Sequence, residues 1–251
     1  MLKRTQGSLG KPRASLRYLL HGRETSNFTY ENLNEEELIR FCADTLGEPP
    51  DLARRYWDKL RADDVLLDGL RGKLREKPFR NDEPLLGYRR ASYCFARIWK
   101  PRVIVETGLH DGLQASVLLR ALELNSHEGS PGKLVSLDLI PDAGWLIDDS
   151  LRRFHEIRTG DVAQTLPAVL EENEVDFLIE DVGAYLPQKP HIIESAIGST
   201  TGRLLVLTET DGSAPLASIP TSGGGEAASV RERPAEHFWP GRTMDAVVVR
   251  R

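Results

Sequence analysis

The 251-residue chain is poor in several features that mark whole classes of protein. It has two cysteines, Cys42 and Cys94, which make neither a disulfide framework nor a zinc-ribbon pattern. Its apolar runs are a few residues long, far short of the about 20 needed to cross a bilayer. The net charge of −5 lacks the basic excess typical of nucleic-acid binding. We therefore expect a cytoplasmic globular protein with no nucleic-acid and no membrane partner.

Other absences concern enzyme classes and targeting. The sequence has no G-x-S-x-G elbow, no P-loop and no H-E-x-x-H, so hydrolase, nucleotide triphosphatase and metalloprotease interpretations have no support. Residues 1–30 carry six Lys and Arg against one Glu, but they lack the apolar core of roughly 7–15 residues that a secretory signal needs. We expect this basic arm to be a solvated tail.

The pattern changes near residue 100. Before it, acids following Asn34 and apolar residues at helical spacing predict helices that cover 35–46, 51–70 and 85–99. We interpret residues 1–100 as an N-terminal arm followed by a helical segment, which forms a lid or the face of a homodimer. Residues 101–251 form the second domain.

Short apolar runs alternate with helix-length segments after Pro101. Strands are expected at 103–105, 134–137, 155–159, 175–179 and 204–207, with helices at 113–124, 143–153, 162–170 and 188–197. Runs without polar alternation indicate parallel strands covered on both faces, so the fold class is a Rossmann-like, doubly wound α/β sheet. Two further strands near 227–232 and 244–249 have no helix between them, which predicts a terminal antiparallel pair.

The first strand of this domain runs into a glycine turn of the form Glu-x-Gly-x-x-x-Gly. Glu106 ends the strand, and Gly108 and Gly112 follow. This spacing differs from the G-x-G-x-x-G dinucleotide fingerprint. Gly108 permits a sharp turn, and we expect Gly112 to let the backbone approach a ligand closely. An acid at this strand end suits a cationic ligand and would repel a pyrophosphate.

Acids also follow the next three strands of the expected sheet. Asp138 comes after the second strand, where it can bind ribose hydroxyls, and Asp161 after the third, where it can meet an adenine amino group. Asp181 follows the fourth strand. The carboxyl ends of parallel strands share one edge of the sheet, which is where open α/β sheets bind ligands.

This arrangement resembles the class I S-adenosylmethionine-dependent methyltransferases, and above all the small-molecule O-methyltransferases that carry the Glu-x-Gly-x-x-x-Gly motif. The resemblance covers about residues 88–250. It implies a seven-stranded sheet with a reversed last strand, S-adenosylmethionine as the cofactor, and methyl transfer to an oxygen, less readily a nitrogen, of a small-molecule acceptor. It also implies cofactor-binding roles for these residues: Glu106, Thr107, Gly108, His110, Gly112, Asp138, Asp161 and Asp181.

Methyl transfer to a hydroxyl benefits from a base near the strand ends, and the candidates are Asp181, His110 and His191. Magnesium-dependent members of the family place Asp-Asn after the fifth strand, where this chain has Glu209-Thr210. Asp181 and Glu209 could still supply two carboxylates, but magnesium is not favoured and no metal site is assigned.

Three alternatives stay open. The first is a nicotinamide-dependent oxidoreductase. The second is a non-catalytic descendant that keeps the fold and binds the cofactor or a partner. The third is a use of the cofactor for chemistry other than methyl transfer, because function depends on the site and not on the fold.

Overall fold

The computed structural model describes residues 31–76, 83–181, 189–210, 226–233 and 243–250. The helices are α2 (Glu35–Leu46), α3 (Pro50–Arg61), α4 (Asp64–Arg75), α5 (Arg89–Trp99), α6 (Leu113–His127), the 3-10 helix η3 (Asp149–Phe154), α7 (Val162–Glu172) and α8 (Lys189–Ser199). The strands are β1 (Glu31–Asn32), β2 (Val103–Thr107), β3 (Lys133–Asp138), β4 (His155–Thr159), β5 (Phe177–Glu180), β6 (Arg203–Thr210), β7 (Glu226–Ser229), β8 (Glu232–Arg233) and β9 (Thr243–Arg250).

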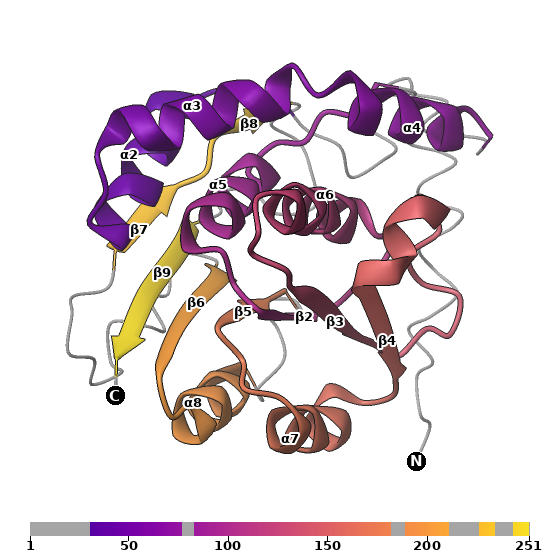
Figure 1. Ribbon diagram of the computed structural model, residues 1–251, viewed down its shortest axis with the longest axis vertical. Helices are drawn as coiled ribbons and strands as arrows, with labels where there is room; N and C mark the ends of the chain where they lie inside the picture. Colours follow the sequence, from indigo (N-terminus) through magenta and orange to yellow (C-terminus); the bar gives the residue numbers. More distant parts are fainter. Residues whose placement is uncertain (1–30, 77–82, 182–188, 211–225, 234–242, 251) are drawn as a thin grey trace, which may run out of the picture.

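Seven of these strands form one sheet in the order β4-β3-β2-β5-β6-β9-β7 (Figure 1). The pairs from β4 to β6 are all parallel. The last strand, β9, lies between β6 and β7 and runs antiparallel to both. The expected doubly wound sheet with a reversed last strand is confirmed. A separate two-stranded ribbon joins β1 to β8.

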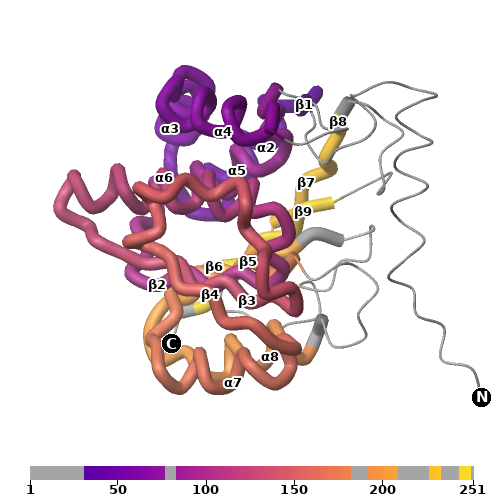
Figure 2. The backbone as a smooth tube through the Cα atoms, turned by 90° about the vertical axis from the view of Figure 1, so that its right-hand side faces the viewer, coloured from indigo at the N-terminus to yellow at the C-terminus, as the bar shows by residue number. Residues whose placement is uncertain are grey.

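Both faces of the sheet are covered, which is why its strands lack polar alternation. Helices α5 and α6 lie on one face, and α7 and α8 lie on the other (Figures 1 and 2). On β2, Ile104 packs into the core on the α5 and α6 side, and its neighbour Val105 packs into the core on the α7 and α8 side. Successive strand residues point to opposite faces, so each central strand contributes to two cores.

The helices before residue 100 continue the first of these cores. Figure 2 shows α2, α3 and α4 forming an outer layer above α5 and α6. Phe41 of α2 contacts Phe95 of α5 edge to face at 5.5 Å between ring centroids. Phe95 in turn contacts Phe177 of β5 at 6.3 Å. One row of aromatic rings therefore connects the outer helices to the sheet. The arm at residues 1–30 lies outside the described part of the chain.

The expectation of one helix over 51–70 is wrong. The chain forms α3 and α4, with a break at Ala62 and Asp63. The Asp63 carboxylate accepts the N–H of Leu66 at 3.2 Å and caps α4. The apolar spacing continues across the break because both helices bury their apolar faces against the same core.

The expected helix over 143–153 is also wrong. The segment is a turn with Gly144 at φ +81°, followed by the 3-10 helix η3. The N–H of Gly144 donates to the carbonyl of His110 at 2.9 Å, and the N–H of Leu146 donates to that of Asp111. These bonds hold the segment against the glycine turn, where a continuous helix could not lie.

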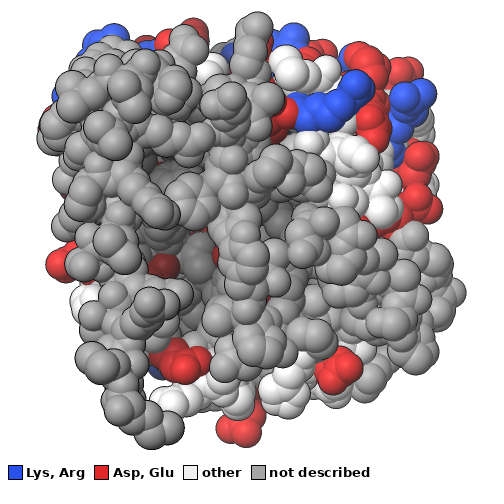
Figure 3. Space-filling model, turned by 180° about the vertical axis from the view of Figure 1, so that it is seen from behind, with Lys and Arg blue, Asp and Glu red and all other residues white. Residues whose placement is uncertain are grey.

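No helix in the described part has both the length and the apolar character needed to span a bilayer. In Figure 3, basic and acidic side chains of the described residues lie next to one another near one corner of the back face. Arg54 pairs with Glu36 and Arg71 with Glu83 on the surface of the outer helices.

Candidate functional site

The glycine turn connects β2 to α6 at the carboxyl edge of the sheet. Gly108 and Gly112 both have φ +86°, and His110 between them has φ +49°, a left-handed conformation that is uncommon for a residue with a Cβ. The N–H of Gly108 donates to the carbonyl of Leu137 at 2.8 Å, which ties the turn to the end of β3. The Glu-x-Gly-x-x-x-Gly spacing therefore produces a tight turn with two left-handed glycines.

Glu106 at the end of β2 is completely buried. Its Oε2 accepts the hydroxyl of Ser136 at 2.8 Å, and its Oε1 has no hydrogen-bond partner in the described part of the chain. Burial raises the pKa of Glu106 to about 8, against the opposing effects of the Ser136 hydrogen bond and the Arg89 guanidinium. The turn thus has at its base a carboxyl group that is neutral at pH 7 and has one free acceptor.

Asp111 caps the start of α6 from inside the turn. Its Oδ1 accepts the N–H of Leu113 at 3.1 Å. Burial alone would raise its pKa, but the neighbouring His110 ring, the Arg89 guanidinium and the Leu113 N–H together lower it. One N–H at the N-terminus of α6 is therefore bonded to the chain's own carboxylate. The His110 ring is more than half exposed and lies 3.7 Å from Asp111.

The space beside Gly112 in which a side chain would lie is filled by the chain itself. A Cβ on Gly112 would lie 2.7 Å from the Cα of Gly144 and 3.0 Å from the side chain of Ile147. The chain's own segment 143–147 fills that space. Glycine is required at position 112 because this segment of the same chain packs against it.

Asp138 at the end of β3 accepts two backbone N–H groups. Its Oδ2 binds the N–H of His110 and its Oδ1 binds the N–H of Ile140, both at 2.8 Å. The carboxylate thereby fixes the glycine turn and the loop that follows β3. Two apolar side chains come directly after it, Leu139 at 71% exposure and Ile140 at 54%. Sequence reasoning missed this pair, although two adjacent apolar residues next to a strand-end acid were a usable signal.

Asp161 lies beyond the third strand end and caps α7. Its Oδ1 accepts the N–H of Ala163 at 2.9 Å, and its side chain is exposed. The N–H of the preceding Gly160 donates to the carbonyl of Asp138 at 2.8 Å. The ends of β3 and β4 are thus joined through Asp138 and Gly160.

Asp181 follows β5 and is tied to β2. Its N–H donates to the carbonyl of Thr107 at 3.1 Å and approaches the Thr107 hydroxyl at 3.2 Å. Thr107 is buried, so its side chain is used inside the fold. The residue before Asp181, Glu180, is the fully buried acid of this strand, and its Oε2 accepts the Thr208 hydroxyl at 2.7 Å.

The predicted residues therefore divide into two groups. Backbone hydrogen bonds bring together the turn and three acids, Asp138, Asp161 and Asp181, at one edge of the sheet. His191 is exposed on α8, and no contact among the described residues joins it to them. No group of three or more acids, histidines or cysteines in the described part is placed to hold a metal. The side chain of Glu209 lies outside that part.

Comparison with known proteins gives a clear result for structure alone. No protein-family model matches the chain, and no curated protein matches its sequence. The O-methyltransferase from Bacillus cereus in complex with SAH is similar with a TM-score of 0.53 at 17% identity, over 86% of this chain and 100% of that one. The O-methyltransferase TomG from Streptomyces achromogenes in complex with SAM gives 0.52 at 17% identity, over 74% and 91%.

A third neighbour has a similar score. The SAH-bound methyltransferase PaMTH1 of Podospora anserina has a TM-score of 0.50 at 14% identity, over 75% of this chain and 88% of that one. The chain therefore has the Rossmann-like fold of the S-adenosylmethionine-dependent methyltransferases, and the resemblance inferred from the glycine turn is confirmed at the level of the fold.

Proposed function

We propose that the chain is an S-adenosylmethionine-dependent methyltransferase that acts on an oxygen, less readily a nitrogen, of a small molecule. The observation that carries this proposal is the buried carboxyl group of Glu106, whose Oε1 has no partner in the described part of the chain. A buried acid with a free acceptor suits a ligand that brings positive charge. S-adenosylmethionine brings two cations, a sulfonium and an ammonium.

The other residues at this edge fit the remaining parts of the cofactor. Asp138 uses each oxygen for one backbone N–H, and each retains a lone pair for a ribose hydroxyl. Leu139 and Ile140 offer exposed apolar surface beside it, which suits the face of an adenine. Asp161 would accept from the adenine amino group.

The cofactor supplies a methyl group on a positively charged sulfur, which becomes a neutral thioether when the acceptor attacks. The chain must hold the acceptor in line with that bond and accept the acceptor's proton. Asp181 suits the role of base because it is half-buried and its backbone is fixed to Thr107. His110 and His191 remain candidate bases at the turn and at the start of α8.

The neighbours support the oxygen acceptor and the cofactor. TomG and the Bacillus cereus protein are O-methyltransferases by name, solved with SAM and with SAH. At 17% identity they do not define the acceptor, so a small molecule remains our proposal. We also propose a cytoplasmic location, because Cys42 and Cys94 are free thiols, and a lid or homodimer face on α2, α3 and α4.

A nicotinamide dinucleotide suits this site less well. Its pyrophosphate would lie at the start of the helix after the first strand. In this chain, Asp111 already caps that helix start, and Glu106 lies below it. The Asp111 carboxylate disfavours a pyrophosphate at this point, and the free acceptor of Glu106 favours a cationic donor.

Titration calorimetry with S-adenosylmethionine and with S-adenosylhomocysteine tests the proposal. We expect both to bind, and Asp138→Asn to weaken both by about tenfold because one charge and one acceptor are lost. Asp142→Asn is the matched control, since Asp142 is exposed four residues further on. Absence of binding at millimolar ligand would overturn the proposal.

Product analysis separates an enzyme from a non-catalytic descendant. The wild type and Asp181→Asn are incubated with S-adenosylmethionine and a panel of phenols, alcohols and amines. We expect demethylated cofactor to form with an oxygen acceptor, and Asp181→Asn to lower the rate while the cofactor still binds. A protein that binds the cofactor and converts no acceptor would be a binding protein.

A further inference from the structure

A chain of three side chains crosses the sheet below the glycine turn. Glu106 on β2, Ser136 on β3 and His155 on β4 project from the same face, the one covered by α5 and α6. The Ser136 hydroxyl lies 2.8 Å from Oε2 of Glu106 and 2.9 Å from Nε2 of His155. Glu106 and Ser136 are fully buried, and His155 is half-buried. The hydrogen bonds between these side chains therefore connect the buried acid to a residue nearer the surface.

The single hydrogen of the Ser136 hydroxyl allows two arrangements. When Glu106 is ionised, Ser136 donates to Oε2 and accepts from an Nε2–H of His155. When Glu106 is protonated, its proton belongs on Oε2, because a proton on Oε1 would be a buried donor without an acceptor. Oε2–H then donates to Ser136, which donates to an unprotonated Nε2. The imidazole is neutral in both arrangements and differs only in its tautomer.

The charged groups around these three side chains agree with this description. Burial lowers the pKa of His155 to about 4, with a further contribution from Arg152, so the ring stays neutral near pH 7. The groups that act on Glu106 are Arg89 from α5, Asp111 from the turn and Asp138 from β3. Arg89 favours the ionised form, and the two carboxylates oppose it.

We propose that Ser136 and His155 are positioning residues that carry the proton of Glu106 to solvent when a cationic ligand binds at the glycine turn. The proton passes from Oε2 to the Ser136 oxygen, the Ser136 proton passes to Nε2, and Nδ1 releases its proton to water. One proton leaves, no bond other than O–H and N–H changes, and Glu106 becomes a carboxylate beside the cation. This inference rests on the proposed function, because the ligand is the cofactor.

Nitrogen-15 NMR of the ligand-free protein tests the hydrogen-bonded connection from Glu106 through Ser136 to His155. We expect the His155 ring to change from the Nδ1–H to the Nε2–H tautomer as the pH rises through about 8, without becoming charged. The change should be absent in Glu106→Gln and unaffected in His127→Phe, which alters an exposed histidine at the end of α6. A His155 tautomer that stays constant from about pH 6 to about pH 9 would overturn the proposal.

Calorimetry in buffers of different ionisation enthalpy tests the link to binding. S-adenosylhomocysteine should release close to one proton at pH 7, and its affinity should rise about tenfold per pH unit below pH 8. Methylthioadenosine lacks the ammonium and should release none. Ser136→Ala should move the midpoint of this pH profile upward, since the Ser136 hydroxyl lowers the pKa of Glu106. His155→Phe should move it in the same direction, because the ionised arrangement then lacks the Nε2–H that donates to Ser136.

The outcomes separate this proposal from the proposed function. Binding of S-adenosylhomocysteine without proton release, or with the same pH profile in His155→Phe as in the wild type, would contradict the proton path alone. Absence of binding would contradict the cofactor, and with it the link between the proton path and binding. A merely structural role of His155 would lower affinity equally at every pH.

Discussion

Gly112 and Gly144 lie back to back, so close that a Cβ on Gly112 would come within 2.7 Å of the Cα of Gly144. Gly112 starts α6, and Gly144 lies in the turn after β3. The N–H of Gly144 bonds to the carbonyl of His110, so the two segments also share a hydrogen bond. The glycine turn is thus held from one side by the chain itself.

We expect Gly112→Ala to cost about 2–4 kcal/mol of unfolding free energy. The left-handed backbone costs about 1–2 kcal/mol, and the overlap with Gly144 adds the rest. Urea unfolding measures the loss. Gly129→Ala is the matched control, because Gly129 has φ +84° and nothing within 4 Å of its Cβ position. Equal losses in the two variants would show that the contact with Gly144 does not matter.

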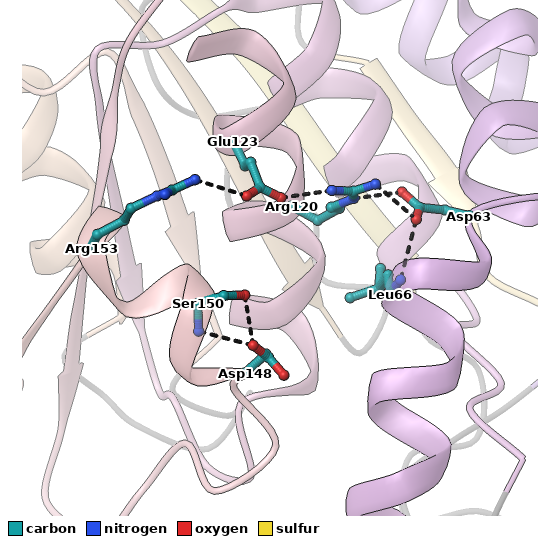
Figure 4. Close-up of polar contacts among 7 residues, drawn as sticks. All are labelled: Asp63, Leu66, Arg120, Glu123, Asp148, Ser150 and Arg153. Carbon is teal, nitrogen blue, oxygen red and sulfur yellow. Dashed lines mark hydrogen bonds and ion pairs between the residues drawn. The ribbon is translucent and has the colours of Figure 1, made fainter. Parts of the chain in front are cut away.

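Asp63 joins the outer helices to α6. Figure 4 shows its carboxylate between the N–H of Leu66 and the guanidinium of Arg120, with Glu123 and Arg153 continuing the chain of charges. Arg120 Nε lies 2.8 Å from Oδ2 of Asp63. This side chain therefore caps α4 and also pairs with a mostly buried cation.

Asp63→Ala should lower the unfolding free energy by about 2–3 kcal/mol, from about 1 for the cap and the rest for the lost ion pair with Arg120, which keeps only Glu123 as a partner. Asp63→Asn keeps an acceptor and should lose less. Asp68→Ala removes an exposed partner of Arg71 and should change stability by about 0.5 kcal/mol or less. Thermal unfolding of the three variants checks the order, and a loss in Asp68→Ala as large as that in Asp63→Ala would refute it.

The sequence predicts most of the sheet and less of the site. Unbroken apolar runs such as Val103-Ile104-Val105 identify the parallel strands, because burial on both faces leaves no room for polar alternation. The break at Asp63 and the turn at Gly144 escaped prediction because each depends on contacts with distant segments, Arg120 in one case and His110 in the other.

The site residues show the same limit. Their positions at strand ends follow from sequence order, so their common edge could be predicted. The directions of their side chains could not. Glu106 points into the core, whereas Asp161 is exposed, and the contact of Ser136 with His155 joins residues 19 positions apart across two strands.

Glu106 makes stability depend on pH. Its pKa is about 8 in the folded chain, against 4.5 for an unperturbed glutamic acid, so the folded state holds a proton that the unfolded state has lost. The contribution of Glu106 to the unfolding free energy should therefore fall as the pH rises from about 5 to about 8, by at most about 1.4 kcal/mol per unit. Denaturant unfolding at a series of pH values should show this fall in the wild type above about pH 6.5, where His155 no longer titrates, and a flatter profile there in Glu106→Gln.

His155 acts in a lower window, which overlaps that of Glu106 between about pH 5 and about pH 6.5. Its pKa is lowered from 6.5 to about 4, so the unfolded state binds the extra proton first. The contribution of His155 should fall as the pH drops from about 6.5 to about 4, so it opposes the contribution of Glu106 above about pH 5. The net fall should appear below about pH 5, and His155→Phe should reduce it. If Glu106→Gln left the profile above about pH 5 unchanged, Glu106 would be ionised in the folded protein, contrary to this account.

Leu139 is too exposed to serve the core. We expect Leu139→Ser to leave the unfolding free energy within about 0.5 kcal/mol of the wild type and to weaken S-adenosylhomocysteine binding by about tenfold, since it removes apolar cover beside Asp138. Val65→Ser on α4 is the control, because Val65 is 72% exposed. Calorimetry decides, and equal affinities in the two variants would remove Leu139 from the site.

The central claim is that the carboxyl ends of β2, β3 and β4 hold the cofactor. A crystal structure of the chain with S-adenosylhomocysteine tests it most directly. The account predicts ribose hydroxyls on Asp138, the adenine beside Leu139 and Ile140, and the ammonium next to Glu106. A ligand bound at another edge of the sheet, or one whose ribose does not touch Asp138, would contradict it.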